Sequence, residues 1–284
     1  MSDTTVTGGG RRTFDLGGVV LTVLSVICAL LWFFPVYWAI ATSLRKDDAT
    51  VTDFALIPQE PSLGNYFYVF ANTKMPLWYL NSTITSLSIT VIAVFVAACT
   101  GYAISQLKFP GRQLLWLTIL ASFMVPVSAL IVNHFIIIAS IKTLNTYPGI
   151  ILPMLLTPVT VIVYKQFFDG LPREFRDAAV MDGATEFQLL FRVFLPMNWG
   201  VTTALAIITF IGAWNAFLWP FLAAQDETMM TVTVGITAVQ DAFGVRYGRW
   251  LAEAVLAGLP VAVAYLLFQR RVTQAITLSA GIKG

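Results

Sequence analysis

Six apolar stretches, each long enough to cross a membrane as a helix, divide this chain of 284 residues. A transmembrane helix needs about 20 predominantly apolar residues. The stretches lie at 16–44, 77–107, 113–141, 143–164, 199–224 and 250–269. The fourth contains three prolines, so we expect that helix to be kinked or partly unwound. The sequence therefore predicts an all-α, polytopic membrane protein with six transmembrane helices.

The overall composition agrees with a membrane protein. Hydrophobic residues make up 57% of the chain and charged residues 11%, whereas a soluble domain carries about 25% charged residues. The formal net charge of +2 gives no indication of nucleic-acid binding. Cys28 and Cys99 both lie in apolar stretches, which favours buried thiols over a disulfide framework. The first stretch is too long for a cleavable signal peptide.

Basic residues predict the orientation in the membrane. With the N-terminus inside, the inner segments hold eleven Lys and Arg residues and the outer segments hold six. An excess of basic residues marks cytoplasmic loops. We therefore expect a cytoplasmic N-terminal tail at 1–15, a transmembrane domain at 16–269 and a cytoplasmic C-terminal tail at 270–284. The segment at about 165–198 then lies in the cytoplasm, and those near 45–76 and 225–249 lie outside.

Polar side chains are scarce in the six stretches, and we expect His134 to be the one ionisable residue deep in the membrane. Ion-coupled transporters often keep more, because intramembrane charges are costly and persist mainly for function. A solute path would then be lined by neutral polar and aromatic groups, which suit an uncharged hydroxylated ligand. The candidates are Asn81, Ser82, Thr83, Asn133, Trp214, Asn215 and Trp219. The same residues also fit helix packing and interfacial aromatics, and His134 fits a packing hydrogen bond or a relay.

The cytoplasmic segment stands out, because 165–192 carries five acidic and four basic residues. Its sequence predicts two short helices. Pro172 suits a first helical turn, and Asp182–Gly183 marks a turn where glycine can end a helix. Thr185 and Gln188 match a capping box. An apolar stripe follows at i, i+3, i+4 and i+7, formed by Phe187, Leu190, Phe191 and Phe194.

The residues of this segment are compatible with two interpretations. It could lie on the membrane surface, which explains the apolar stripe. It could also dock on another protein, because small Ala178 and Ala179 permit close approach of a partner backbone while the flanking charges fix its register. The second interpretation explains the first helix better.

The motif "DAAVMDGA", followed by Leu195–Pro196, resembles the signature loop of the membrane subunits of ATP-binding-cassette importers. Asp177 stands where that loop usually has Glu. "WNAFLWP" at 214–220, "LNT" at 144–146 and the ending "FQRRVTQAITLSAGIKG" are similar to the maltose-type carbohydrate branch, and in particular to its smaller membrane subunits. Ala275 replaces a glycine that is usual there.

The resemblance implies a type I importer permease that moves a sugar, oligosaccharide or polyol into the cytoplasm across the inner cell membrane. A coupling helix would engage a separate ATPase dimer through Asp177, Ala178, Ala179, Asp182, Gly183, Ala184 and Pro196. This chain has no phosphate-binding loop, so ATP-Mg is expected on the ATPase, with no catalytic residue, metal site or cofactor here. A second, different permease subunit and an extracytoplasmic solute-binding protein are the other implied partners. The tip of an outer loop would meet that protein at Ala242, Phe243, Gly244, Val245 and Arg246.

Three alternatives remain. The chain could be a permease of the same superfamily for another neutral solute. It could be a single-chain, ion-coupled secondary transporter, which predicts two matching halves with interrupted spans that the sequence does not display. It could also be a structural membrane scaffold. The sequence names neither the solute nor the partner chains.

Overall fold

Every regular element in the described part of this chain is a helix. The computed structural model describes residues 16–46, 57, 60–155, 157–238 and 246–281. In chain order, the elements are α1 (Leu16–Ser43), α2 (Gly64–Asn72), α3 (Met75–Gln106), α4 (Arg112–Met124), η1 (Val127–Leu130), α5 (Ile131–Ser140), α6 (Tyr147–Ile151), η2 (Leu152–Leu155), α7 (Pro158–Asp169), α8 (Arg173–Met181), α9 (Glu186–Leu189), η3 (Leu190–Phe194), α10 (Leu195–Met197), α11 (Trp199–Trp214), α12 (Leu218–Ala223), α13 (Val232–Ala238) and α14 (Tyr247–Gly281).

Three helices are long and apolar enough to cross a membrane alone, namely α1, α3 and the part of α14 up to Gln269. Three bent pairs pass the same test: α4 with η1–α5, α6–η2 with α7, and α9–α10 with α11. Counting each pair as one span gives six among the described residues, in agreement with the number predicted. The helix α14 also continues past Arg270 and Arg271 to Gly281, so no helix end marks the predicted start of the tail.

The stretch 113–141 is a broken helix, which its length alone did not reveal. Its two parts meet at 95° around Val125 and Pro126. Val125 is extended (φ −79°, ψ 120°), as expected before a proline, whose ring disfavours helical geometry in the preceding residue. With 13 residues, α4 spans about 20 Å and is too short to cross a hydrocarbon core of about 30 Å.

The predicted kink in the stretch 143–164 is confirmed. Its two parts bend by 48°. Pro148 lies in the first turn of α6 and Pro158 begins α7, positions at which a missing N–H costs no helical hydrogen bond. Lys142 separates this stretch from α5 as predicted, and it adopts positive φ (55°) in the turn between them.

The fifth stretch differs from the prediction of one span at 199–224. The helix α11 ends at Trp214, and the separate short helix α12 begins at Leu218. At its other end α11 meets the α9–α10 segment at 84°, next to Asn198. The gap between Trp214 and Leu218 therefore falls inside the predicted range of 199–224. At the other end of α11, the helices α9 and α10 lead back into the charged segment.

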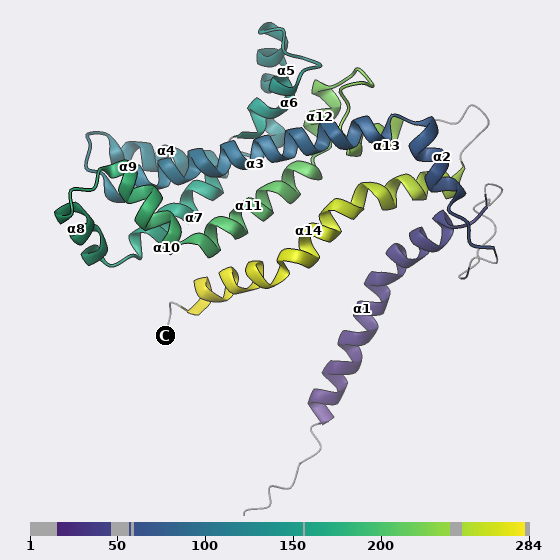
Figure 1. Cartoon of the computed structure of the whole chain (residues 1–284), viewed down its shortest axis with the longest axis horizontal. Helices are drawn as coiled ribbons and strands as arrows, with labels where there is room; N and C mark the ends of the chain where they lie inside the picture. Colours follow the sequence, from purple (N-terminus) through teal and green to yellow (C-terminus); the bar gives the residue numbers. More distant parts are fainter. Residues whose placement is uncertain (1–15, 47–56, 58–59, 156, 239–245, 282–284) are drawn as a thin grey trace, which may run out of the picture.

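Helix α3 is the axis of the fold, with α7 and α11 packed along it and α14 packed on α11 (Figure 1). Its face toward α7 carries small residues four positions apart, namely Ala93, Ala97 and Gly101, and all three are buried. A Cβ on Gly101 would lie 2.7 Å from Cβ of Tyr164. This spacing lets two membrane helices approach closely and gain van der Waals contact.

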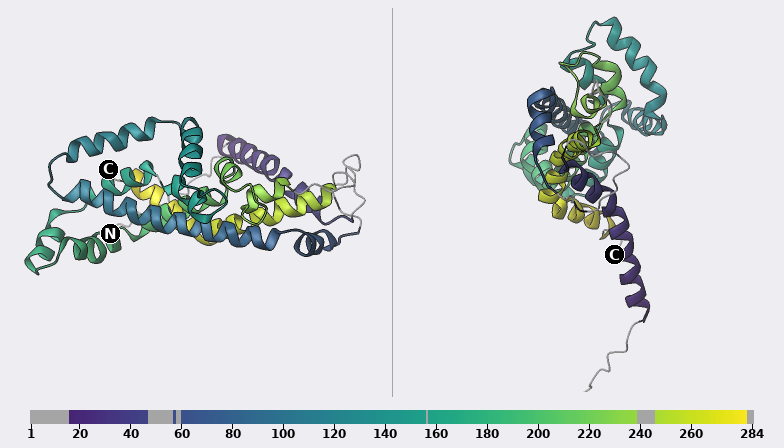
Figure 2. Two further views of the ribbon diagram at one scale, coloured as in Figure 1. Left: turned by 90° about the horizontal axis from the view of Figure 1, so that it is seen from above. Right: turned by 90° about the vertical axis from the view of Figure 1, so that its right-hand side faces the viewer.

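Helix α1 stands apart from this bundle and contacts it mainly through α14 (Figures 1 and 2). Its apolar side chains are open, with Trp32 85% exposed and Leu31 68% exposed. Exposed apolar surface of this extent suits contact with acyl chains or another membrane subunit, and not with water.

Glu253 corrects the expectation about ionisable residues in the membrane. It lies in the sixth predicted stretch, within the first two turns of α14, and it is only 1% exposed. Its neighbour Ala252 belongs to a buried cluster with Val69 and Trp78 at the same end of α3. His134, by contrast, is half-buried beside the Trp219 ring, with their centroids 6.0 Å apart.

Candidate functional site

Helix α8 projects from one end of the molecule, away from the bundle (Figure 1). None of its residues is buried, and its exposed apolar side chains include Phe175, Val180 and Met181, the last 87% exposed. Asp177 and Ala178 are exposed as well. A protruding helix with apolar and charged groups on its surface is suited to docking on another protein.

A glycine ends α8, as the sequence predicted. Gly183 adopts φ of +78°, and the amides of Gly183 and Ala184 donate to the carbonyls of Val180 and Ala179, each over 3.0 Å. These two bonds form the Schellman arrangement, in which a residue with positive φ closes the helix. Ala179 and Ala184 also pack against the buried core of the bundle. The signature glycine therefore turns the chain back, and the two alanines fix the end of α8 to the body.

An ion pair and a hydrogen bond tie α8 to the axis of the fold. Arg176 pairs with Glu186 over 2.6 Å. The hydroxyl of Tyr102 on α3 donates to the other carboxylate oxygen of Glu186 over 2.5 Å. The Tyr102 ring packs edge-on against Phe168 and Phe194 in the core. Sequence reasoning missed this connection, because Tyr102 lies 84 residues from Glu186.

The helix after the turn begins as predicted but buries a different face. Thr185 and Gln188 form the capping box. The following turn, η3, is a π-helix, which shifts the angular positions of its side chains. Of the predicted stripe, Leu190 and Phe194 are buried, while Phe187 and Phe191 lie on the surface with ring centroids 5.0 Å apart. Pro196 is exposed in α10.

A small hollow of about 360 Å³ lies between the end of α8 and the helix that follows. Four of the predicted coupling residues line it, namely Ala179, Asp182, Gly183 and Ala184. The polar side chains of Gln188 and Arg192 in the next helix line it as well. Apolar alanines, a carboxylate and a guanidinium thus face one concave surface. Such a surface can accept a side chain from a docked partner.

The predicted path residues that the structure buries have their polar groups engaged inside the protein. Asn81 donates to the carbonyls of Thr228 and Met230, each over 2.9 Å, and accepts from the Tyr147 hydroxyl over 2.8 Å. Trp214 donates to Ala257 O over 3.0 Å and Trp219 to Ile150 O over 3.1 Å. These contacts join parts of the chain that are distant in sequence, which is a packing role.

The remaining path candidates are divided between packing and exposure. Ser82 is buried and accepts from the amide of Val232 over 2.8 Å. Thr83, Asn133 and Asn215 are exposed. A path lined by exposed Asn133 and Asn215 stays a prediction.

At the end of α3 opposite to α8, the described part of the predicted outer loop is fastened by hydrogen bonds. Asn145, the centre of the "LNT" motif, adopts positive φ (56°), and its side chain accepts from the amides of Gln225 and Asp226 over 2.7 and 2.9 Å. Asp226 accepts from the amide and hydroxyl of Thr228, which lowers the pKa of its carboxyl. Asparagine tolerates this backbone conformation better than most residues, which explains the motif.

The predicted tip of this outer loop is only partly covered by the structure. Ala242, Phe243, Gly244 and Val245 lie outside the described residues, and Arg246 directly precedes α14. Within the described ranges, no three His, Cys, Asp or Glu side chains gather where they could hold a metal ion.

Known proteins with similar sequences are named as permeases. The chain is 29% identical over 275 residues to the arabinooligosaccharides transport system permease protein AraQ of Bacillus subtilis, covering 95% of this chain and 98% of the relative. It is 30% identical to the sulfoquinovosyl glycerol transport system permease protein SmoH of Agrobacterium fabrum, covering 99% of each. It is 32% identical to the sn-glycerol-3-phosphate transport system permease protein UgpE of Yersinia pestis, covering 92% and 95%.

The fold is also similar to that of a solved structure. A chain of a bacterial ABC transporter involved in the import of the acidic polysaccharide alginate superposes with a TM-score of 0.84 at 20% identity, covering 92% of this chain and 98% of that one. A family model described as "Binding-protein-dependent transport system inner membrane component" matches residues 89–277, which include both α8 and the outer loop. The chain therefore belongs to the family of inner membrane components of binding-protein-dependent transport systems.

Proposed function

We propose that this chain is a permease subunit of an ATP-driven importer that moves a sugar, oligosaccharide or polyol into the cytoplasm. Membership of a binding-protein-dependent family supports import with a separate solute-binding protein. The relatives' names support a carbohydrate or a polyol derivative, since they include an arabinooligosaccharide and two glycerol derivatives. The ion-coupled secondary transporter has no support from this family.

The observation that carries the proposal is the build of α8. Its outer face is open, while its end is held to the core by the Gly183 turn, the two alanines and the Arg176–Glu186–Tyr102 connection. A mobile loop would change its own conformation when a partner displaces it. A helix fixed in this way would instead transmit the displacement to α3.

We assign the driving step to a partner. ATP-Mg would bind a separate ATPase dimer, and closure of that dimer would move α8 through Asp177, Ala178, Ala179 and the Gly183 turn. A second permease subunit would complete the pore, and the exposed apolar side chains of α1 suit contact with such a subunit. This division leaves the present chain without a catalytic role.

The proposed orientation places both termini and α8 in the cytoplasm. The excess of eleven basic residues over six on the inner side supports it. The binding protein would then meet the opposite end, where Asn81 and Asn145 fix the outer loop. Arg246 and the preceding tip residues stay our candidates for that contact.

A different solute of the same superfamily is the second candidate. The UgpE relative is named for sn-glycerol-3-phosphate, which carries an anionic phosphate, so relatives of this chain are not restricted to neutral solutes. Uptake of a labelled panel of oligosaccharides, polyols and phosphorylated polyols separates the two candidates. Cells lacking this chain should lose uptake of one class and keep the others.

Isolation of the assembled complex tests the importer itself. The tagged chain, purified in mild detergent from its native membrane, should bring with it an ATPase with a phosphate-binding loop and a second permease. A tagged Gly183→Val variant serves as the comparison, since it should insert normally but retain less ATPase. Purification of the chain alone under several mild conditions would overturn the proposal.

A further inference from the structure

A hollow with a basic lining lies between the start of α4 and the adjoining ends of α3 and α7. Its volume is about 510 Å³, and it opens to the outside. Arg112 and Lys165 line it together with Trp116, Leu114 and Phe109. None of these residues belongs to α8 or to the outer loop, so the proposed coupling and docking functions leave this site unexplained.

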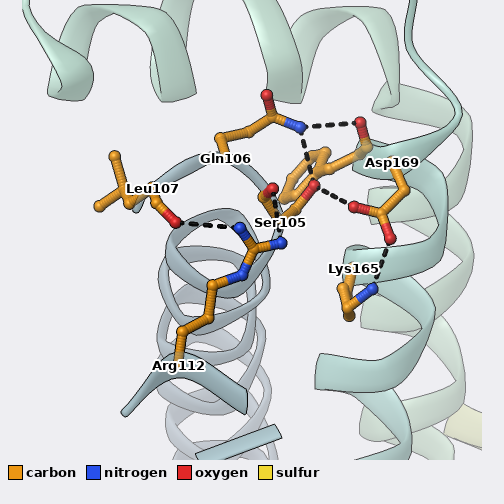
Figure 3. A network of polar contacts seen from close by, with 7 residues as sticks. Ser105, Gln106, Leu107, Arg112, Lys165 and Asp169 are labelled. Atoms are coloured by element: carbon orange, nitrogen blue, oxygen red, sulfur yellow. Dashed lines mark hydrogen bonds and ion pairs between the residues drawn. The ribbon is translucent and has the colours of Figure 1, made fainter. Parts of the chain in front are cut away.

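The two basic side chains in the hollow share a single neighbouring carboxylate. Arg112 donates to the carbonyls of Leu107 and Ser105, each over 3.2 Å, and these acceptors are neutral (Figure 3). Lys165 pairs with Asp169 over 2.5 Å, but Asp169 also accepts from the Ser105 hydroxyl over 2.6 Å. One carboxylate therefore faces two cations at this end of α3, and the local charge is positive.

The neighbouring structure holds both cations in place. The Lys165 ammonium lies 4.8 Å from the centroid of the Trp116 ring, and its side chain is only 18% exposed. A cation over an indole face is attracted by the ring. Arg112 is the first residue of α4, and its two bonds reach back to the end of α3. The positions of both groups are thus set before any ligand arrives.

The start of α4 adds to the positive potential. The helix has 13 residues, begins after Gly111 (φ +81°), has no side-chain cap and carries no acidic residue in its first turn. The dipole of this helix therefore favours an anion at this end. The hollow and its two cations are the basis of the inference, and this helix end agrees with them.

We propose that this hollow binds the headgroup of an anionic phospholipid. Charge complementarity identifies the headgroup, since basic pockets at the edge between transmembrane helices suit anionic lipids. The surroundings indicate a lipid and not a soluble anion. Trp116 is the residue type favoured at headgroup level, and Leu114 (71% exposed) and Leu117 (54% exposed) continue along α4 as an apolar surface for acyl chains.

Fluorescence quenching at Trp116 tests the proposal. The protein, purified with its native partners, is placed in phosphatidylcholine nanodiscs, and increasing fractions of brominated phosphatidylglycerol or brominated phosphatidylcholine are added. The fluorescence of Trp116 is obtained by subtracting the emission of the Trp116→Phe variant from that of the wild type. We expect half-maximal quenching at a mole fraction about fivefold lower for the anionic lipid, which corresponds to the attraction of one basic residue near a charged membrane.

Matched variants separate this site from general surface charge. Lys165→Gln should abolish the preference for the anionic lipid, whereas Lys108→Gln, which removes the same charge from an exposed residue outside the lining, should keep it. Arg112→Gln replaces Lys165→Gln if the latter does not assemble. Equal quenching by the two lipids, an equal loss in Lys108→Gln, or full reversal by inorganic phosphate in place of unlabelled phosphatidylglycerol would each overturn the proposal.

Discussion

The two ends of α3 meet regions that are built in opposite ways. At its start, Trp78, Asn81 and Ser82 bond to backbone groups of a loop about 150 residues away, which fastens that part of the loop to the helix. At its far end, Tyr102 holds Glu186, and the helix beyond it leaves its charged and apolar groups exposed. The loop at the first end is held by long-range hydrogen bonds within the chain, whereas α8 leaves a surface suited to a partner.

This contrast predicts that the outer region is the more sensitive to stability changes, and the α8 region to changes in transport. The largest effect should come from Gly235→Ala on α13. A Cβ there would lie 2.2 Å from the Trp78 ring, and overpacking costs about 3 kcal/mol at such a site. The thermal unfolding midpoint and the yield of assembled complex should both fall. Gly212→Ala, whose Cβ would meet nothing within 4 Å, is the control and should behave as wild type.

Asn81→Ala should have the next largest effect. It leaves the carbonyls of Thr228 and Met230 and the hydroxyl of Tyr147 without their partner, and an unsatisfied buried group costs about 2 kcal/mol. Thermal unfolding and hydrogen exchange of residues 228–232 should both report the loss. Thr83→Ala, two positions along on an exposed site, is the matched change. Equal unfolding midpoints for the two variants would argue that Asn81 faces a solute and not the loop.

Gly183→Ala tests the α8 end of this comparison. Its Cβ meets nothing within 4 Å, so the cost is the left-handed backbone alone, about 1 kcal/mol. We expect little change in the unfolding midpoint but a several-fold loss of solute uptake, because the exit of α8 is redirected. Gly170→Ala, at φ −77° and with ordinary contacts, should leave uptake unchanged. Normal uptake by Gly183→Ala would contradict the coupling role of this turn.

The smallest effect on stability should come from Glu186→Gln. It removes the ion pair with Arg176, which is partly exposed and worth about 0.5 kcal/mol, but an amide oxygen can still accept from Tyr102. The expected result is a higher number of ATP molecules hydrolysed per solute imported, since α8 is held less firmly to α3. Glu174→Gln, on the outer side of α8, is the control for charge. An unchanged ratio in Glu186→Gln would show that the ion pair does not transmit movement.

Local features of this molecule could be predicted from the sequence, and long-range ones could not. The Gly183 turn and the Thr185–Gln188 capping box depend on neighbours within a few residues, and both were predicted correctly. The kink near Pro148 and Pro158 was predicted for the same reason. Pro126 indicated a break in the same way, but the stretch 113–141 was assigned as one helix from its length alone.

The roles of Asn81 and Tyr102 needed the structure. Their partners lie 147 and 84 residues away, so no spacing rule connects them. The π-turn at η3 changes the helical period on which the apolar stripe was predicted, and Phe187 and Phe191 of that stripe lie on the surface. Glu253 stands in the sequence within the stretch 250–269 and was overlooked there, whereas its burial needed the structure.

The uninterrupted length of α3 has a mechanical consequence. With 32 residues and proline only in its first turn, it is a stiff rod about 48 Å long that joins the α8 end, where we propose that the ATPase docks, to the end where we propose that solute arrives. A tilt of about 5° at one end displaces the other by about 4 Å, as for any lever of that length. A movement of α8 of the kind we propose would therefore be carried by α3 to its opposite end without a hinge in between.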